Sequence, residues 1–189
     1  EAGVRITTTA GELVAEHLIL ATGSPVLDRG GYFAKLEPLR SYATAYRVPG
    51  AIPQGMYLGV DHPTRSLRTI PVDGEELLMV GGNGHVVGRA DSEAEAVADL
   101  RRWTGRYFPG ARATHAWSAQ DYRAMDRVPY VGEMPRGGGR IFVATGYNKW
   151  GMTNGVAAAL SLSARLLGGS MPWAEAHASR TPRPAVVLG

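Results

Sequence analysis

The sequence predicts an α+β fold, in which a mixed or antiparallel sheet is combined with a few helices. Residues 39–88 contain short strand-like segments separated by turn signals, which is typical of an antiparallel sheet. A capping box, Asp91-Ser92 with Glu95, then opens an amphipathic helix. Further along, an apolar strand runs through glycines directly into a second helix.

The chain opens with a predicted hairpin. Residues 4–8 alternate between apolar and polar side chains, and residues 10–12 turn the chain into a second apolar run over residues 13–22. That run ends in Ala21-Thr22-Gly23, where the glycine lets the backbone pass close to a neighbouring group.

The predicted sheet of residues 39–88 consists of four strands. They are Arg40–Arg47, Gly55–Val60, Ser66–Pro71 and Glu76–Gly82. The pair Asp73-Gly74 between the last two is a strong hairpin signal. In the helix that follows, Leu100, Trp103 and Tyr107 are expected on the buried face, and residues 113–120 are expected to return to the sheet.

The last predicted strand, Ile141–Thr145, leads through Gly146 into a helix that ends at Gly168-Gly169. The first turn of a helix leaves backbone N–H groups unpaired and carries the positive end of the helix dipole. A strand that enters a helix through glycine therefore forms a site for an anion or a ring carbonyl near Gly151.

Composition excludes several classes of function. Hydrophobic residues make up 44% and charged residues 20%, with a net charge of +3 and scattered arginines, so nucleic-acid binding is not expected. Apolar runs fall short of the ~20 residues of a membrane span, and no signal peptide is visible, so a cytoplasmic location is expected. Without cysteine and with five dispersed histidines, the chain is expected to bind no metal and no iron–sulfur cluster.

An ordered series of short motifs identifies a family resemblance. The motifs are His17–Pro25, Tyr107–Ala111, Trp117-Ser118, Asp126–Gly132 and Arg140–Gly155. In this order they resemble the C-terminal half of FAD-dependent oxidoreductases of the D-amino-acid oxidase class, which includes glycine oxidase, sarcosine oxidase and gamma-glutamylputrescine oxidoreductases. The resemblance covers most of residues 4–168 and implies FAD as cofactor, an amine or amino acid as substrate, and hydride transfer to the flavin.

The motif that binds the dinucleotide pyrophosphate in these enzymes, G-x-G-x-x-G, does not occur in this sequence. The nearest glycine cluster, residues 81–84, has the wrong spacing. We therefore expect the chain to be a fragment, inactive alone, whose partner is the remainder of the parent flavoenzyme.

The resemblance also implies a division of the chain. Residues 1–38 would belong to an incomplete FAD-binding α/β part, residues 39–125 to a substrate-binding domain, residues 126–170 to the returning FAD-binding part with the flavin-ring helix, and residues 171–189 to a tail or linker.

Site residues follow from the same resemblance. The expected cofactor contacts are Ala21, Thr22, Gly23, Gly146, Tyr147, Trp150, Gly151, Met152 and Thr153. Lys149 is a candidate ligand for a substrate carboxylate, with a solvated loop lysine as the alternative. Arg68 would face the substrate cavity from its strand, or occupy a solvated edge. The segment from Asp126 to Pro129 is expected to be a structural bracket beneath the flavin, with Asp126 hydrogen-bonded to the backbone.

Two alternatives remain at this point. A non-catalytic binding or interface module of a multi-subunit flavoprotein could use the same fold. A flavin-dependent monooxygenase is a third possibility, which the spacing between Trp117-Ser118 and Asp126 disfavours.

Overall fold

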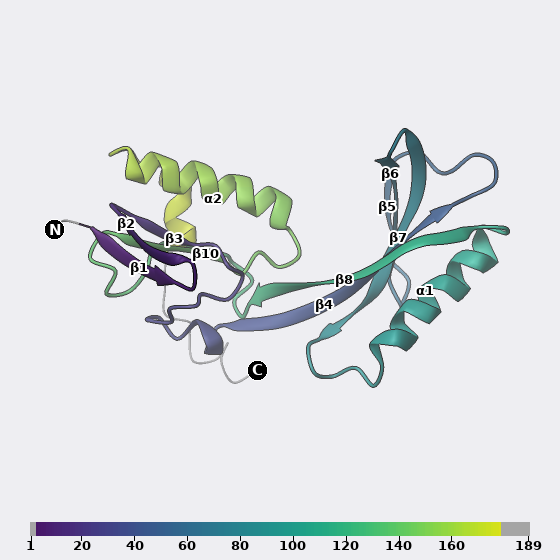
Figure 1. Ribbon diagram of the computed structural model, residues 1–189, viewed down its shortest axis with the longest axis horizontal. Coiled ribbons are helices and arrows are strands. Elements are labelled where there is room, and N and C mark those ends of the chain that lie inside the picture. The colour runs from purple at the N-terminus through teal and green to yellow at the C-terminus, as the bar shows by residue number, and fades with distance from the viewer. Residues whose placement is uncertain (1–2, 179–189) are drawn as a thin grey trace. The chain divides into compact units, whose positions relative to one another are not determined.

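The computed structural model describes residues 3–178, which form two compact units (Figure 1). Of the described residues, one unit contains 3–38 and 121–178, and the other contains 39–120. Both combine helices with sheets, so the predicted α+β class is confirmed. Of the expected tail or linker, residues 171–189, the part from residue 179 onward lies outside the described residues.

The first unit contains a hairpin and a separate three-stranded sheet. The hairpin joins β1 (Val4–Thr8) to β2 (Gly11–Ala15), as the alternation predicted. In the sheet, β10 (Ile141–Thr145) lies between β3 (Leu18–Leu20) and β9 (Tyr130–Glu133). It is parallel to β3 and antiparallel to β9, and all five of its residues are buried.

Helix α2 (Gly151–Leu166) covers one face of this sheet. Its small and branched side chains Ala158 and Leu162 pack on Val131, Phe142 and Ala144. The opposite face packs a second apolar cluster that includes Tyr32 of the short 3-10 helix η1 (Tyr32–Ala34). A second 3-10 helix, η2 (Pro172–His177), follows α2. Because both faces of β10 are covered, its position and direction are firmly held.

The second unit is built on a five-stranded sheet in the order β5-β6-β7-β4-β8. Its strands are β4 (Leu36–Arg47), β5 (Met56–Leu58), β6 (Arg65–Val72), β7 (Glu75–Val86) and β8 (Arg112–Ala124). The predicted hairpin is confirmed, since Val72 pairs with Glu75 and both turn residues, Asp73 and Gly74, have positive φ.

Helix α1 (Glu93–Tyr107) packs on β7 of this sheet. Ser92 caps it, since its hydroxyl accepts a hydrogen bond from the N–H of Glu95 at 3.2 Å. Leu100 is fully buried, as predicted. The prediction for Tyr107 was wrong: its ring is 56% exposed and lies against Trp103 at a centroid distance of 4.7 Å, because it belongs to the last turn of the helix.

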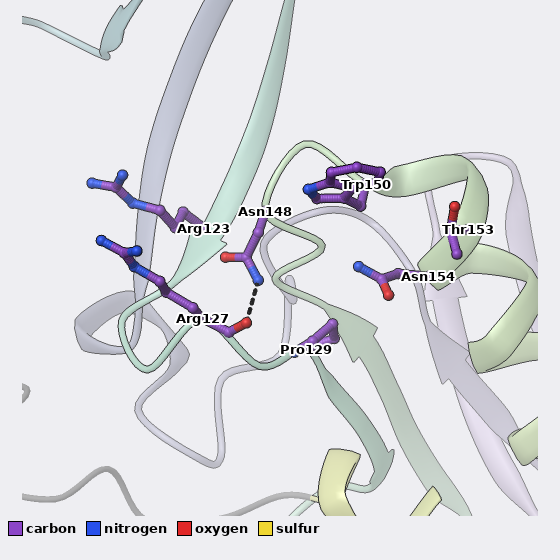
Figure 2. A pocket seen from close by; sticks show the side chains of 7 residues that line it. All are labelled: Arg123, Arg127, Pro129, Asn148, Trp150, Thr153 and Asn154. Atoms are coloured by element: carbon purple, nitrogen blue, oxygen red, sulfur yellow. Dashed lines mark hydrogen bonds between the residues drawn. The ribbon is translucent and has the colours of Figure 1, made fainter. Parts of the chain in front are cut away.

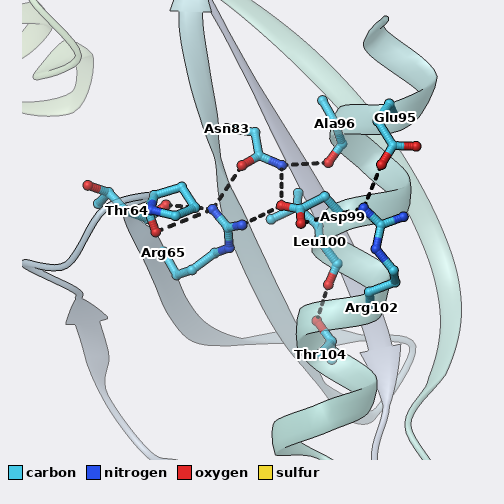
Figure 3. A network of polar contacts seen from close by, with 10 residues as sticks. Thr64, Arg65, Asn83, Glu95, Ala96, Asp99, Leu100, Arg102 and Thr104 are labelled. Atoms are coloured by element: carbon cyan, nitrogen blue, oxygen red, sulfur yellow. Dashed lines mark hydrogen bonds and ion pairs between the residues drawn. The ribbon is translucent and has the colours of Figure 1, made fainter.

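A partly buried polar network fastens α1 to β6 and β7 (Figure 3). The guanidinium of Arg65 contacts Asp99 of α1 and donates to Oδ1 of Asn83 at 2.9 Å. Asn83 in turn donates to the carbonyl of Ala96 at 2.7 Å. Position 82, next to Asn83, requires glycine, because a Cβ added there would lie 2.8 Å from the carbonyl oxygen of Thr64.

Candidate flavin-ring site

The parallel pairing of β3 and β10 brings two segments from distant parts of the sequence to one edge of the sheet. Leu18 pairs with Ile141 and Leu20 with Val143, so both strands end at the same side. The segment Ala21–Gly23 follows the first strand, and Gly146–Trp150 follows the second. The hydroxyl of Thr145 donates a hydrogen bond to the carbonyl of Gly23 and joins the two segments directly. Ligands of open α/β sheets bind at such carboxyl ends of strands.

Two glycines in these segments are needed for the packing of the chain itself. Gly23 has φ of 80°, and an added Cβ would lie 2.7 Å from the ring of Tyr122. Gly146 has φ of 76° and is packed against Ala124 and Leu36. A side chain at either position would disturb the fold, whatever ligand the edge binds.

The turn between β10 and α2 is held by Asn148, a residue that the sequence alone did not single out. Its Oδ1 accepts a hydrogen bond from the N–H of Ala124 at 2.9 Å, and its Nδ2 donates to the carbonyl of Arg127 at 2.9 Å. Asn148 has φ of 54° and Lys149 has φ of 68°. The available sequence signal was an Asn between a strand and a helix. Asn adopts the left-handed conformation more readily than most other residues, so it is a common residue in such turns.

The first turn of α2 is open to a ligand. Trp150 occupies the N-cap without a side-chain hydrogen bond to the helix, and no acidic residue lies in the first turn. Gly151, Met152 and Thr153 are all exposed. An added Cβ on Gly151 would meet no atom within 4 Å, so there is open space beside this residue. The free N–H groups and the helix dipole favour a partly negative oxygen there.

A hollow of about 540 Å³ lies beside this turn (Figure 2). The residues that line it are Arg123, Arg127, Pro129, Asn148, Trp150, Thr153 and Asn154. Trp150 and Thr153 were predicted from the sequence. The remaining five residues are not among the cofactor contacts expected from the sequence. Pro129 was predicted only as part of a bracket, in which Asp126 accepts a hydrogen bond from the N–H of Val128 at 3.2 Å, as expected.

Lys149 lies next to this hollow but does not line it. Its Nζ is 3.9 Å from Oδ2 of Asp121. Burial raises the pKa of Asp121, and the positive charges of Lys149 and Arg123 partly offset that effect. Burial also raises the pKa of Tyr147 in the same turn. Lys149 therefore differs from a lysine surrounded only by solvent, and the nearby carboxylate of Asp121 offsets part of the positive charge that it could offer to a ligand.

Arg68, the other candidate substrate ligand, belongs to the second unit. It is exposed in β6, and its guanidinium lies 3.6 Å from the sulfur of Met79. Its role as a substrate ligand stays a prediction.

Comparisons with known proteins agree with this geometry. Residues 1–165 match the family described as DAO, FAD dependent oxidoreductase. The chain belongs to this family. Members of the family depend on FAD, so FAD is the cofactor of the enzyme class to which the chain belongs.

Similar proteins of two kinds are found. A Bacillus subtilis (strain 168) protein, YhfW, whose name includes the words Rieske 2Fe-2S iron-sulfur protein, is 33% identical over 159 residues, or 84% of this chain and 31% of that protein. Glycine oxidase from Geobacillus kaustophilus has a TM-score of 0.75 at 20% identity, over 97% of this chain and 50% of the other. L-amino acid deaminase from Proteus vulgaris has a TM-score of 0.66 at 19% identity, over 93% of this chain and 45% of the other.

The chain therefore spans about half the length of these solved structures and about a third of YhfW. At such low identities the solved structures show a shared fold.

The residues at the edge fit a flavin ring. The first turn of α2 is uncapped, and the space beside Gly151 is open. No acidic side chain lines the adjacent hollow. The first-turn N–H groups could therefore donate hydrogen bonds to a ring carbonyl. Among residues 3–178, no helix is long and apolar enough to cross a membrane, and no group of His, Cys, Asp or Glu side chains could hold a metal ion.

Proposed function

We propose that this chain supplies the flavin-ring site and the substrate-binding part of an FAD-dependent oxidoreductase that oxidises an amino acid or amine by hydride transfer. The observation that carries the proposal is the uncapped N-terminus of α2, which lies at the same sheet edge as the loop after β3. Bound FAD would supply the two-electron acceptor, while the protein positions the substrate and stabilises negative charge.

In this proposal the N–H groups of Gly151, Met152 and Thr153 stabilise the negative charge that develops on the ring during reduction. Preorganised backbone donors act strongly in such a role because they need no rearrangement as charge develops. Ala21, Thr22, Gly23, Gly146, Tyr147 and Trp150 form the rest of the edge that faces the cofactor. Residues 1–38 and 126–170 would make up the chain's share of the FAD-binding domain.

Residues 39–125 would hold the substrate, with Arg68 from this range and Lys149 from the turn before α2 as separate ligand candidates. Lys149 is close to Asp121, and the negative charge of Asp121 would weaken the attraction of Lys149 for a substrate carboxylate. The pyrophosphate site would come from the remainder of the parent polypeptide, and the chain alone would be inactive.

The similarity to YhfW favours a particular electron acceptor. That relative carries the words Rieske 2Fe-2S in its name, and its 31% coverage leaves room for another domain. We propose that the parent enzyme passes electrons from the flavin to an iron–sulfur cluster rather than to oxygen. Such a cluster would be bound outside this chain, which has no cysteine to ligate it.

Anaerobic reduction of the full-length enzyme tests this proposal. The purified, yellow protein is mixed with a panel of amino acids and with their decarboxylated amines, and loss of the oxidised flavin absorbance is followed. Bleaching by at least one compound, slowed when its α-hydrogen is replaced by deuterium, is expected for hydride transfer. A protein that binds FAD but is reduced by none of them would instead support the non-catalytic module.

The acceptor is tested separately by re-oxidation. An iron–sulfur acceptor predicts that the reduced enzyme gives the electron paramagnetic resonance signal of a reduced Rieske cluster before it reacts with oxygen. Rapid re-oxidation by oxygen, without such a signal, would contradict this part of the proposal.

A further inference from the structure

The strands of the second unit direct alternate side chains to two different faces of the sheet. On one face, Leu67 and Val80 pack in the apolar cluster that contains Leu100 of α1. Successive residues of a strand point to opposite faces, so Arg68 and Met79 belong to the face that α1 does not cover. Arg68 is exposed there and Met79 is half-buried.

Three long side chains form a row across this second face. Met56 of β5 pairs with Arg68 of β6, and Arg68 pairs with Met79 of β7. Directly paired residues of an antiparallel sheet hold their side chains next to each other on one face. Nη2 of Arg68 lies 3.6 Å from the sulfur of Met79, and Met56 is 84% exposed. The row Met56–Arg68–Met79 is therefore accessible from its β5 end.

The neighbouring row on the same face leaves room beside these three side chains. Leu58 pairs with Ser66, Ser66 with Gly81, and Gly81 with Ala43. Three of these four residues are small, and a Cβ added to Gly81 would lie 2.7 Å from Oγ of Ser66. Leu58 is 75% exposed and adds an apolar side chain at the β5 end. A flat apolar group fits beside the row without displacing a large side chain.

The charge of Arg68 is not offset by a carboxylate. Within residues 3–178, no ion pair joins its side chain to Asp or Glu. Its neighbour in the row, the thioether of Met79, is only a weak hydrogen-bond acceptor. A guanidinium is attracted to the face of an aromatic ring, and methionine sulfur also makes favourable contacts with aromatic rings. The row thus complements an aromatic ring electrostatically, whereas a saturated ring of the same size gains neither contact.

We infer that the row Met56–Arg68–Met79 determines specificity by receiving an aromatic side chain of the substrate. This inference rests on the proposed function, in which residues 39–125 hold the substrate. It gives Arg68 a task other than carboxylate binding, because the guanidinium contacts the ring. The substrate class is then an amino acid or amine with an aromatic side chain.

The test compares substrates that differ only in the ring or in the carboxylate. Full-length, FAD-loaded enzyme is assayed with phenylalanine, cyclohexylalanine, alanine and phenethylamine, using for each amino acid the enantiomer that reduces the flavin faster. Benzyl alcohol and cyclohexylmethanol, tested as competitive inhibitors, report on the ring without any carboxylate. The variants are Arg68→Met and Met79→Leu, and the control is Arg89→Met, because Arg89 is an exposed arginine of the same unit outside the row.

For the wild type we expect kcat/KM for phenylalanine to exceed that for alanine by more than tenfold and that for cyclohexylalanine by about three- to tenfold. Benzyl alcohol should bind about three- to tenfold more tightly than cyclohexylmethanol. Arg68→Met should lower kcat/KM for phenylalanine and phenethylamine alike, by about threefold or more, and leave alanine near the wild-type value. Met79→Leu should show a smaller loss in the same direction, and Arg89→Met should match wild type.

Equal kcat/KM values for phenylalanine and cyclohexylalanine, together with equal inhibition by the two alcohols, would overturn the inference; this comparison uses wild-type enzyme and holds even if a variant does not fold. A loss in Arg68→Met for both amino acids but not for phenethylamine would also overturn it, by assigning Arg68 to the carboxylate, and would leave the proposed function intact. Failure of every amino acid and amine to reduce the wild-type flavin would instead overturn the proposed function itself.

Discussion

Substitutions at Gly151 separate the needs of the cofactor from the needs of the fold. In the structure Gly151 is exposed at the start of α2, its φ is not positive, and an added Cβ would meet no atom within 4 Å. Alanine and valine have better helix propensities than glycine, so neither should destabilise the protein, and alanine should add at most about 1 kcal/mol of stability. Any loss of flavin must then come from the space and the N–H groups that the ring requires.

The expected loss can be estimated from the contacts. Each neutral hydrogen bond contributes about 0.5–1.5 kcal/mol, so displacing the ring from two N–H groups of this turn costs about 1–3 kcal/mol, or roughly a five- to hundredfold rise in the dissociation constant of FAD. Gly151→Ala should show a rise of this order. Gly151→Val, with a branched side chain in the same space, should leave the full-length enzyme colourless.

Flavin content and reconstitution of the apoenzyme with FAD measure these effects. Gly105→Val provides the control, because Gly105 is an exposed position inside α1 where an added Cβ also meets nothing within 4 Å. The control should retain its flavin. Yellow, active Gly151→Val enzyme would refute the placement of the ring above this turn.

Three further predictions follow from the same geometry. The 189-residue chain alone should bind FAD weakly or not at all in titration calorimetry, because it lacks the pyrophosphate motif and the remaining contacts must offset the ordering of a large ligand; nanomolar affinity would contradict this. Lys149→Met should raise the KM of an amino acid more than that of the matching amine, although Asp121 offsets part of the lysine charge and so limits the effect; equal changes for both substrates would assign Lys149 to a solvated loop. Burial raises the pKa of Asp121, so the folded state binds a proton there more readily than the unfolded chain, and the resulting stability is present at low pH and lost as pH rises through the raised pKa. Asp121→Asn should therefore have a higher Tm than wild type at neutral pH, with the difference disappearing below about pH 3.8; a lower Tm at neutral pH would show that the pair with Lys149 outweighs burial.

Local signals predicted the elements that depend on neighbouring residues. Asp73-Gly74 form the hairpin turn because both adopt positive φ, which Asp and Gly tolerate. The strand Ile141–Thr145 was predicted with the bounds that the structure has, because five apolar or small residues stand between turn signals. The start of α2 at Gly151 followed from the glycines and the helical spacing after them.

The lining of the hollow was not predictable in the same way. Asn148 holds Ala124 and Arg127, which are 24 and 21 residues away in the sequence. These contacts depend on how the end of β8 meets the turn after β10, through the bridge between Arg123 and Tyr147. No local pattern encodes that pairing.

Periodicity also gave an incomplete view of α2. Met152, Val156 and Leu160 recur at helical spacing, yet they are exposed in the structure, at 89%, 62% and 49%. The residues that pack on the sheet are instead Ala158 and Leu162. Helical spacing of apolar residues identifies an apolar face, but it does not show whether another element of the protein covers that face.

The most direct test of the central claim is the structure of the full-length enzyme with FAD bound. The account predicts that the pyrimidine carbonyl of the flavin ring lies within hydrogen-bonding distance of a backbone N–H of Gly151, Met152 or Thr153, with the loop Ala21–Gly23 at the same edge. A flavin ring bound elsewhere, with the first turn of α2 in contact with solvent or with another part of the polypeptide, would contradict it.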